Sequence, residues 1–350
     1  MKNNKRVLVV ATSSKTRGGI TAVINSYKTT AFWSEFNCVW IETHIDKTPI
    51  DKIIYFFRSL FQFIMLLPSA SLVHVHLSAP GSAKRKFPFL VLAKLFKVPI
   101  IIHFHAFSAE STIDKDYSNL YDRIFKMADT IIVLSESWKK GIIKDLKIEE
   151  SKIKVIYNPC PQIVLNDNIQ KTNTILYAGK IENRKGYKDL IIAFAKIAVI
   201  YPEWKIIFAG NGAINEGKSL SKELHIENQV VFKGWVSGIE KEQLFREANI
   251  FCLPSYAEGF PMAVLDAWAY GLPVITTPVG GIPDVAKEGE NMLLFNPGDT
   301  ETLSEKLMNI ISDNSLNDTI SNASVEFSLN QFSLHSITIE LNKIYIENIH

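Results

Sequence analysis

The sequence predicts an α/β protein built from two doubly wound parallel-sheet domains, and three observations support this prediction. Apolar strand patterns alternate with helical patterns in both halves of the chain, as they do where helices connect parallel strands. The 350 residues exceed the size at which a single core stops growing, and 47% of them are hydrophobic. A Pro-rich break at residues 158–161 and a polar run at 166–173 then separate domains at residues 1–160 and 170–327.

The charge distribution and the cysteine content of the chain indicate which partners and which cell compartment to expect. Residues 1–157 hold 23 Lys and Arg against 13 Asp and Glu, a net of +10, whereas residues 158–350 hold 15 against 23, a net of −8. This asymmetry suggests that the first half faces a membrane surface, a lipid phosphate or a nucleic acid, with unevenly distributed solvated charge as the alternative. Three unclustered cysteines and an N-terminus that enters a strand without a signal-peptide pattern predict a reducing cytoplasm.

The first half opens with an apolar strand from Arg6 to Ala11, followed by a loop and a helix from about Ile20. Gly18 and Gly19 in that loop would let the backbone come close to a ligand. Neither Gly-Lys-Ser/Thr nor G-x-G-x-x-G follows, so the loop is not a P-loop or a dinucleotide fingerprint.

Two further segments of the first half bear on membrane contact. Ile50–Pro68 is the most apolar stretch of the chain, but its uncharged run is too short to span a bilayer. A packed helix of the first domain is the favoured interpretation, and a helix lying in the membrane interface is the alternative. Ala83–Lys97 is a second candidate for membrane contact, because cations flank its apolar residues: Lys84, Arg85, Lys86, Lys94 and Lys97.

Four histidines end two neighbouring strand patterns, Leu72–His76 and Pro99–His105. Period-2 alternation places His103 and His105 on one face, near the edge at which such sheets bind ligands. No carboxylate or Cys joins them at a useful spacing, so we expect no metal.

The second half restarts with a strand at Thr174–Ala178 and a glycine-bounded loop that carries Lys180, Arg184 and Lys185 before a helix. Cations and free amides in such a loop suit a diphosphate, although a basic surface loop is the plain alternative. The strand Trp204–Ala209 then leads into a Gly210-Asn211-Gly212 turn, a partial dinucleotide fingerprint that lacks its third glycine.

The stretch from Pro254 to Gly281 organises this half. A strand at 250–253, a loop with Glu258, a helix beginning at Pro261 and a strand at 273–276 form a βαβ unit. The helix N-terminus therefore lies at the ligand-binding edge of the sheet, where backbone amides of Gly259, Phe260 and Met262 can donate and Glu258 can accept from hydroxyls. Asp266 lies roughly 7–8 Å further along a helix that is otherwise apolar there. The alternative is that Glu258 caps the helix and Asp266 is solvated.

Glu258-Gly259-Phe260-Pro261 followed by Asp266 resembles the E-x7-E donor signature of the retaining glycosyltransferases of family four, with Asp in place of the second Glu. The resemblance covers nearly the whole chain and is most specific from Gly179 to Gly281. It implies the GT-B fold, in which two Rossmann-like domains face a cleft and a C-terminal helix, here residues 328–350, crosses back to the first domain.

The resemblance also implies roles for individual residues. Glu258, Gly259, Phe260 and Pro261 would bind the donor sugar, and Asp266 would bind the ribose. Lys180 and Lys185 would hold the donor diphosphate, with Arg184 compensating for the Lys that replaces the family's Arg at position 180. Gly18 and Gly19 would lie next to the donor diphosphate, and Gly210, Gly212 and Trp235 would line the nucleotide. His105, with His103 as its rival, would lie at the reacting face and act in catalysis together with Glu258 and Lys185.

The function implied is metal-independent, retaining transfer of a hexose-type sugar from a nucleotide-diphospho-sugar, first of all a UDP-sugar, without a further cofactor. The acceptor would be a saccharide or a lipid-diphosphate-linked saccharide in bacterial surface polysaccharide synthesis. We expect a cytoplasmic enzyme with peripheral membrane contact through residues 84–97 and no nucleic-acid partner. The alternatives are a nucleotide-sugar epimerase or hydrolase of the same fold and a non-catalytic partner subunit.

Overall fold

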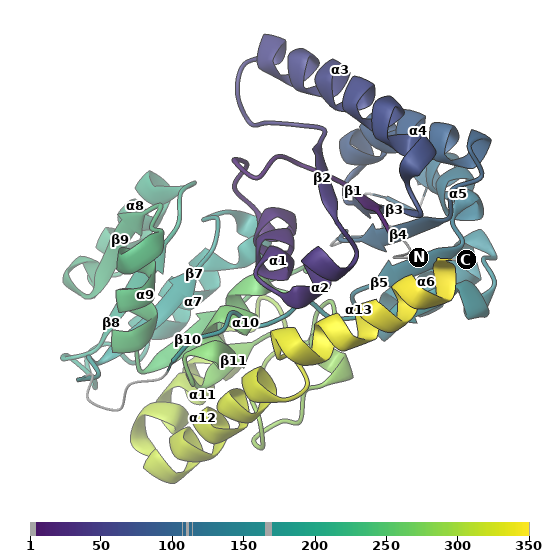
Figure 1. The fold of residues 1–350 in the computed structure, drawn as a ribbon. Coiled ribbons are helices and arrows are strands. Elements are labelled where there is room, and N and C mark those ends of the chain that lie inside the picture. Colours follow the sequence, from purple (N-terminus) through teal and green to yellow (C-terminus); the bar gives the residue numbers. More distant parts are fainter. Residues whose placement is uncertain (1–4, 107, 110–111, 114, 165–169, 350) are drawn as a thin grey trace. The chain divides into compact units, whose positions relative to one another are not determined.

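The computed structural model describes residues 5–106, 108–109, 112–113, 115–164 and 170–349, which form two compact units. Unit 1 comprises the described residues up to Pro159 and those from Leu334 onward, and unit 2 runs from Cys160 to Ser333. Each unit contains a six-stranded parallel sheet covered by helices, which confirms the predicted α/β fold with two Rossmann-like domains (Figure 1). Positions 165–169 of the expected linker lie outside the described residues.

The sheet of unit 1 has the strand order β2-β1-β3-β4-β5-β6. Its strands are β1 (Val7–Ala11), β2 (Val39–Glu42), β3 (Leu72–Leu77), β4 (Ile100–Phe104), β5 (Thr130–Val133) and β6 (Ile153–Val155). Its helices are α1 (Gly19–Lys28), α2 (Ala31–Glu35), α3 (Pro49–Leu66), α4 (Pro80–Leu95), α5 (Ser118–Met127), α6 (Glu136–Leu146) and α13 (Leu334–Asn348).

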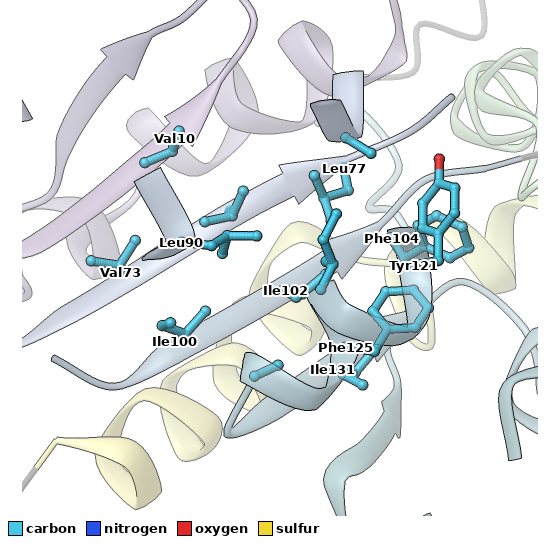
Figure 2. Packing of buried hydrophobic residues seen from close by; sticks show 14 of the residues in the cluster. Val10, Val73, Leu77, Leu90, Ile100, Ile102, Phe104, Tyr121, Phe125 and Ile131 are labelled. Atoms are coloured by element: carbon cyan, nitrogen blue, oxygen red, sulfur yellow. The ribbon is translucent and has the colours of Figure 1, made fainter. Parts of the chain in front are cut away.

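The two faces of this sheet differ because successive residues of a strand point to opposite sides. Val73, Val75 and Ile102 belong to an apolar core that α4, α5 and α6 close (Figure 2). On the opposite face, Nδ1 of His74 lies 2.7 Å from the hydroxyl of Tyr345 in α13. The helix that follows unit 2 in sequence therefore completes the first unit.

The expected C-terminal helix is shorter than its sequence pattern. We expected the crossing helix at residues 328–350, but α12 ends at Leu329 and α13 begins at Leu334. Asn348 of α13 exchanges hydrogen bonds of 3.1 and 3.2 Å with the hydroxyl of Thr130 in β5. The packing of this helix on the first domain agrees with the resemblance.

The apolar stretch Ile50–Pro68 forms α3 and a short 3-10 turn. Thr48 and Asp51 form a capping box at its start, which fixes the first turn. Its inner face packs on α4, where the rings of Phe63 and Phe89 have centroids 5.1 Å apart. No helix within the described residues is long and apolar enough to cross a membrane.

The prediction of membrane contact is wrong for one cation of α4, Lys86. Lys86 is only 1% exposed, and its ammonium group donates to the carbonyl of His76 and, at 2.9 Å, to the hydroxyl of Ser82. Burial lowers its pKa well below the ordinary value for lysine. Lys86 therefore supports the end of β3 from inside the unit and cannot belong to a membrane-facing patch.

Unit 2 has the strand order β12-β11-β10-β7-β8-β9. Its strands are β7 (Thr174–Ala178), β8 (Lys205–Ala209), β9 (Val230–Gly234), β10 (Ile250–Leu253), β11 (Val274–Thr276) and β12 (Leu293–Leu294). Its helices are α7 (Tyr187–Ala195), α8 (Ile214–Glu223), α9 (Gly238–Glu247), α10 (Met262–Ala269), α11 (Thr300–Ser312) and α12 (Asn314–Leu329). Because the chain runs outward from β7 to β9 and returns to β10, the sheet has its switch point between β7 and β10.

Candidate active site in unit 2

The loops that leave β7 and β10 are locked together beside this switch point. The backbone N–H of Tyr256 donates to the carbonyl of Arg184 at 2.7 Å. Gly186 has φ of 67°, and a Cβ atom there would lie 1.9 Å from the carbonyl oxygen of Pro254. Only glycine allows so close an approach in this conformation, so the two loops form one rigid wall.

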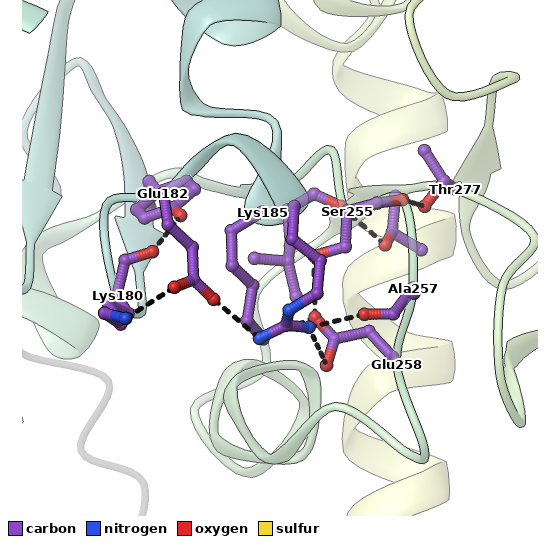
Figure 3. A network of polar contacts seen from close by, with 11 residues as sticks. Lys180, Glu182, Lys185, Ser255, Ala257, Glu258 and Thr277 are labelled. Carbon is purple, nitrogen blue, oxygen red and sulfur yellow. Dashed lines mark hydrogen bonds and ion pairs between the residues drawn. The ribbon is translucent and has the colours of Figure 1, made fainter. Parts of the chain in front are cut away.

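Glu258 lies in this wall, and its residue is 7% exposed. One of its oxygens, Oε1, accepts from the Ser255 hydroxyl at 2.6 Å and from the ammonium group of Lys185 (Figure 3). The other, Oε2, lies 3.8 Å from Nη1 of Arg184, which itself donates to the carbonyl of Ala257 at 2.6 Å. The structure thus brings together Glu258, Lys185 and Arg184, as the sequence predicted for one site.

The third predicted cation belongs to the same network through a residue that the sequence analysis missed. Glu182 pairs with Lys180 at 2.7 Å and with Nη2 of Arg184 at 2.8 Å (Figure 3). Burial raises the pKa of Glu182, but the hydrogen bond from Lys180 and the charge of Arg184 hold it below its ordinary value overall. The sequence did contain a signal for Glu182, because it is an acidic residue among the three cations of one loop.

The segment after Glu258 presents its backbone rather than its side chains. Phe260 is 4% exposed, and its ring packs on Trp268 and Phe332 with centroids 6.0 and 5.2 Å away. Pro261 was expected to be the first helical residue, but with ψ of 111° it is the N-cap of α10, which begins at Met262. A sugar-binding role of this segment would therefore use main-chain groups.

A second glycine holds the same segment from behind. Gly280 has φ of 63°, and a Cβ atom there would lie 2.4 Å from the carbonyl oxygens of both Glu258 and Gly259. The N–H of Gly281 donates to the carbonyl of Gly259 at 2.8 Å. Gly280 was not singled out from the sequence, although its position in a Gly-Gly pair after β11 is a turn signal.

The expected nucleotide-binding residues surround the loop after β7. A Cβ atom at Gly210 would lie 1.8 Å from the carbonyl oxygen of Gly179, and one at Gly212 would lie 2.1 Å from that of Ile181. Trp235 is 48% exposed, and its backbone N–H donates to Oδ1 of Asn211 at 2.9 Å. The turn after β8 and the end of β9 therefore adjoin the cation-rich loop.

Asp266 is not solvated as the plain alternative supposed. Its carboxylate pairs with the ammonium group of Lys241 in α9 at 2.7 Å. Burial raises its pKa, and the charge and hydrogen bond of Lys241 oppose that rise. Glu258 does not cap α10 either, since no side chain caps that helix. Both acids thus have specific partners, which removes the plain interpretation of this pair.

The site residues predicted in unit 1 are Gly18, Gly19 and His105, with His103 as the rival of His105. Gly18 is the N-cap of α1, with φ of 151°, and Gly19 is the first helical residue. A Cβ atom at Gly18 would meet no atom within 4 Å, so this loop leaves open space next to its backbone.

His105 follows β4 and is the last ring of a stack of four. Its Nε2 lies 2.9 Å from Nδ1 of His76, and its ring centroid is 4.3 Å from that of His103. His103 is fully buried, whereas His105 keeps part of its surface exposed. Of the two rivals, His105 alone has surface at which a ligand could make contact.

The other three rings form the buried part of this stack. Ring nitrogens of His74, His76 and His103 lie within 4.8 Å of one another, a spacing that could hold a metal ion, and within the described residues no carboxylate or thiol joins them. Burial lowers the pKa of each ring, to about 3 for His103. The expectation of no metal stays a prediction.

The fold and the group of ion pairs around Glu258 suit a particular class of proteins, and comparison with known proteins identifies that class. Residues 165–326 match the model of group 1 glycosyl transferases, and residues 35–161 match the model of glycosyltransferase family 4. The chain belongs to the group 1 glycosyltransferases, which have the GT-B fold.

Individual relatives agree with this assignment. The chain is 26% identical, over 83% of its length and 80% of the relative's, to the UDP-Gal:alpha-D-GlcNAc-diphosphoundecaprenol alpha-1,3-galactosyltransferase of Escherichia coli. It is 27% identical to a sulfoquinovosyl transferase of Arabidopsis thaliana over 72% of its own length, and spans about half, 52%, of that relative. The structure of HepE from Anabaena in complex with UDP and glucose superimposes with a TM-score of 0.78 at 16% identity, covering 98% of this chain and 100% of that one.

Proposed function

We propose that this protein is a retaining, metal-independent glycosyltransferase that moves a hexose-type sugar from a UDP-sugar to a saccharide or a lipid-diphosphate-linked saccharide. The observation that carries the proposal is the Lys185–Glu258 pair at the switch point of unit 2, beside Arg184. A relative named for transfer of galactose from UDP to a diphosphoundecaprenol-linked sugar supports this acceptor class and a role in bacterial surface polysaccharide synthesis.

The chemistry of the donor half follows from the contacts of Glu258. Ser255 and Lys185 hold Oε1, while Oε2 is 3.8 Å from Arg184 and can accept a hydrogen bond from a sugar hydroxyl. A donor diphosphate would compete with Glu258 for Lys185 and with Glu182 for Lys180. Once they bind the leaving diphosphate, Lys185 and Lys180 would neutralise the charge that develops there as the glycosidic bond breaks.

The remaining site residues keep the roles that the resemblance implied. Asp266 would accept from the ribose hydroxyls, and Gly210, Gly212 and Trp235 would line the nucleotide. In unit 1, His105 would serve the reacting face, and Gly18 and Gly19 would lie beside the diphosphate. No cofactor and no metal ion enters this proposal.

We place the enzyme in the cytoplasm at the inner face of the cell membrane. Of the five cations expected to contact the membrane, Lys84, Lys94 and Lys97 are exposed and Arg85 is half-buried. Lys86 is excluded by its burial.

The test is thermal stabilisation by uridine and guanosine diphosphates and their sugars, with and without EDTA, followed by product analysis with a polyprenyl-diphosphate-linked acceptor. A UDP-sugar at 100 times its Kd should stabilise unit 2 by about 2.7 kcal/mol, and EDTA should not change this. Lys185→Met should abolish the stabilisation, while the matched control Lys188→Met, three residues away and 45% exposed, should keep it.

Three outcomes would contradict the proposal. Loss of activity in EDTA would remove metal independence. Consumption of the UDP-sugar without an acceptor would favour an epimerase or hydrolase. Binding of a UDP-sugar without any turnover would favour a partner subunit.

A further inference from the structure

The outer face of α3 is formed by large apolar side chains that the rest of the protein leaves uncovered. Ile50, Ile53, Ile54, Phe57, Phe61, Ile64 and Met65 are between 42% and 70% exposed. Only Ser59 and Phe63 of this helix are buried. Below, the outer face of α3 means these seven residues.

Helical geometry shows that the seven side chains form one continuous stripe. At 100° per residue, they occupy an arc of about 120° and extend about 23 Å along the axis. The charged residues of the helix, Asp51, Lys52 and Arg58, fall outside this arc. A helix on the surface of a soluble unit ordinarily directs its polar side outward, whereas this one directs an apolar side outward.

The stripe is too large to be an ordinary surface feature. Its exposed area is on the order of 700 Å², while the largest apolar patch of a typical monomer is about 300–600 Å². The opposite side of the helix already has a packing partner, since Phe56 and Phe63 contact Phe89 of α4 with ring centroids 6.1 and 5.1 Å apart. The outer face is therefore a second apolar surface, in excess of what the core requires.

Exposed cations accompany the stripe and indicate what covers it. Arg58, about 20° outside the arc of the stripe, is exposed on α3 itself. Elsewhere in unit 1, the end of α4 carries exposed Leu95 and Phe96, at 72% and 49%, together with exposed Lys94 and Lys97. Residues 1–157 as a whole carry a net charge of +10. An apolar stripe with a cation at its border, on a strongly basic half of the chain, matches a bilayer whose acyl chains lie beneath anionic headgroups.

We propose that α3 lies in the plane of an anionic membrane, with its outer face inserted at the boundary between headgroups and acyl chains. Arg58, at one border of the stripe, is then level with the lipid phosphates. The inference rests on the proposed membrane-proximal function and assigns its insertion element, which is α3 rather than the basic segment 84–97 alone.

Vesicle binding of the full chain tests this inference. The wild-type protein should bind vesicles of phosphatidylcholine with 30 mol% phosphatidylglycerol and bind pure phosphatidylcholine vesicles at least tenfold more weakly. Phe57→Ser combined with Phe61→Ser should weaken binding to the anionic vesicles at least tenfold without lowering Tm, because both side chains are exposed. The matched control, Val199→Ser combined with Ile239→Ser, removes two apolar side chains of unit 2 that are 92% and 84% exposed and should bind like the wild type.

A depth measurement separates insertion from simple adsorption. Tryptophan placed by Phe57→Trp should be quenched by lipids brominated near the top of the acyl chain, and tryptophan placed by Ile239→Trp should not. Arg58→Gln should weaken binding at low salt and reduce its salt dependence, since screened charge–charge attraction is removed.

Several results would overturn the inference. They are a wild-type protein that does not bind anionic vesicles, equal loss of binding in the unit 2 control, or an unquenched tryptophan at position 57. A dimer that dissociates in the Phe57→Ser, Phe61→Ser variant would assign the stripe to a second copy of the chain. The assay contains no nucleotide sugar, so its failure would leave UDP-sugar stabilisation of unit 2 intact, and the reverse also holds.

Discussion

Replacing Lys185 with methionine should destabilise unit 2, because it strands the carboxylate of Glu258. The two side chains are 15% and 8% exposed, so water compensates little for the lost charge. The Ser255 hydroxyl at 2.6 Å and Arg184 at 3.8 Å remain as partners. We therefore expect a loss near the lower end of the range for a broken buried pair, about 3 kcal/mol.

The double variant Lys185→Met, Glu258→Gln isolates the interaction itself. Without a charge to strand, it should lose only about 1 kcal/mol relative to the wild type, so Glu258→Gln should be stabilising by about 2 kcal/mol in the Lys185→Met background. For a unit of this size, 1 kcal/mol corresponds to about 2–4 °C in Tm, so the single Lys185 variant should melt about 6–12 °C lower.

The assay is calorimetry of all four proteins of the cycle, with nucleotide-sugar turnover measured in parallel. Turnover should fall by orders of magnitude in both single variants and should not recover in the double variant. A Lys185→Met transition within 3 °C of the wild type, or strictly additive changes, would show that the pair is not a coupled buried interaction. Recovery of turnover along with stability would show that its role is structural.

Three further outcomes follow from the geometry. Gly280→Ala should lower the stability by more than about 2 kcal/mol and abolish UDP-sugar binding, because its Cβ atom meets two carbonyl oxygens. The control Gly238→Ala, at φ of 57° with nothing within 4 Å, should cost only about 1 kcal/mol of backbone strain. Equal losses of Tm in the two variants would refute the steric argument. Asp266→Asn should weaken UDP affinity at least tenfold while Lys241→Met retains it, and the reverse order in calorimetric titration would remove the ribose contact. The pKa of buried His103 is lowered to about 3, so the unfolded chain binds a proton near pH 6.5 and the folded chain does not. Stability should therefore fall by about 1 kcal/mol for this residue between pH 7 and pH 5.5. Urea unfolding should show a shallower pH dependence in His103→Leu, and an unchanged one would exclude the histidine as its source.

The grouping of Glu258 with the cations of unit 2 could be predicted from the sequence because its signals are local. Each predicted cation precedes a helix within a short glycine-bounded loop, and Glu258 lies in one βαβ unit, so strand order alone brings them to one edge. What the sequence could not supply was pairing across that edge. Glu182 and Ser255 lie close in sequence to the predicted residues, but the contacts that they make depend on side-chain rotamers and on how the two loops pack.

The first half was less predictable for a related reason. β2 at Val39–Glu42 is only four residues long and half-buried, and nothing in its pattern separates it from a loop. In the sequence, Lys86 resembles the two cations that precede it, which suggests a surface position. In the structure, its ammonium group instead donates to the buried carbonyl of His76 at the end of β3. The expected helix at Ile50–Pro68 exists, but only packing shows that its stripe of apolar side chains faces outward.

The placement of α13 has a consequence for the newly made chain. Tyr345 meets His74 across 271 positions of sequence, so unit 1 lacks one of its helices until all of unit 2 has left the ribosome. At about 5–20 residues per second, the interval is roughly 10–35 s. During that time the unit synthesised first exposes the sheet face that carries the histidine stack, while the unit synthesised second, being continuous, can complete its fold. Translation therefore reverses the usual vectorial order, because the unit that is made first is completed last. A chain that ended before residue 334 would carry a continuous unit 2 next to a unit 1 without α13.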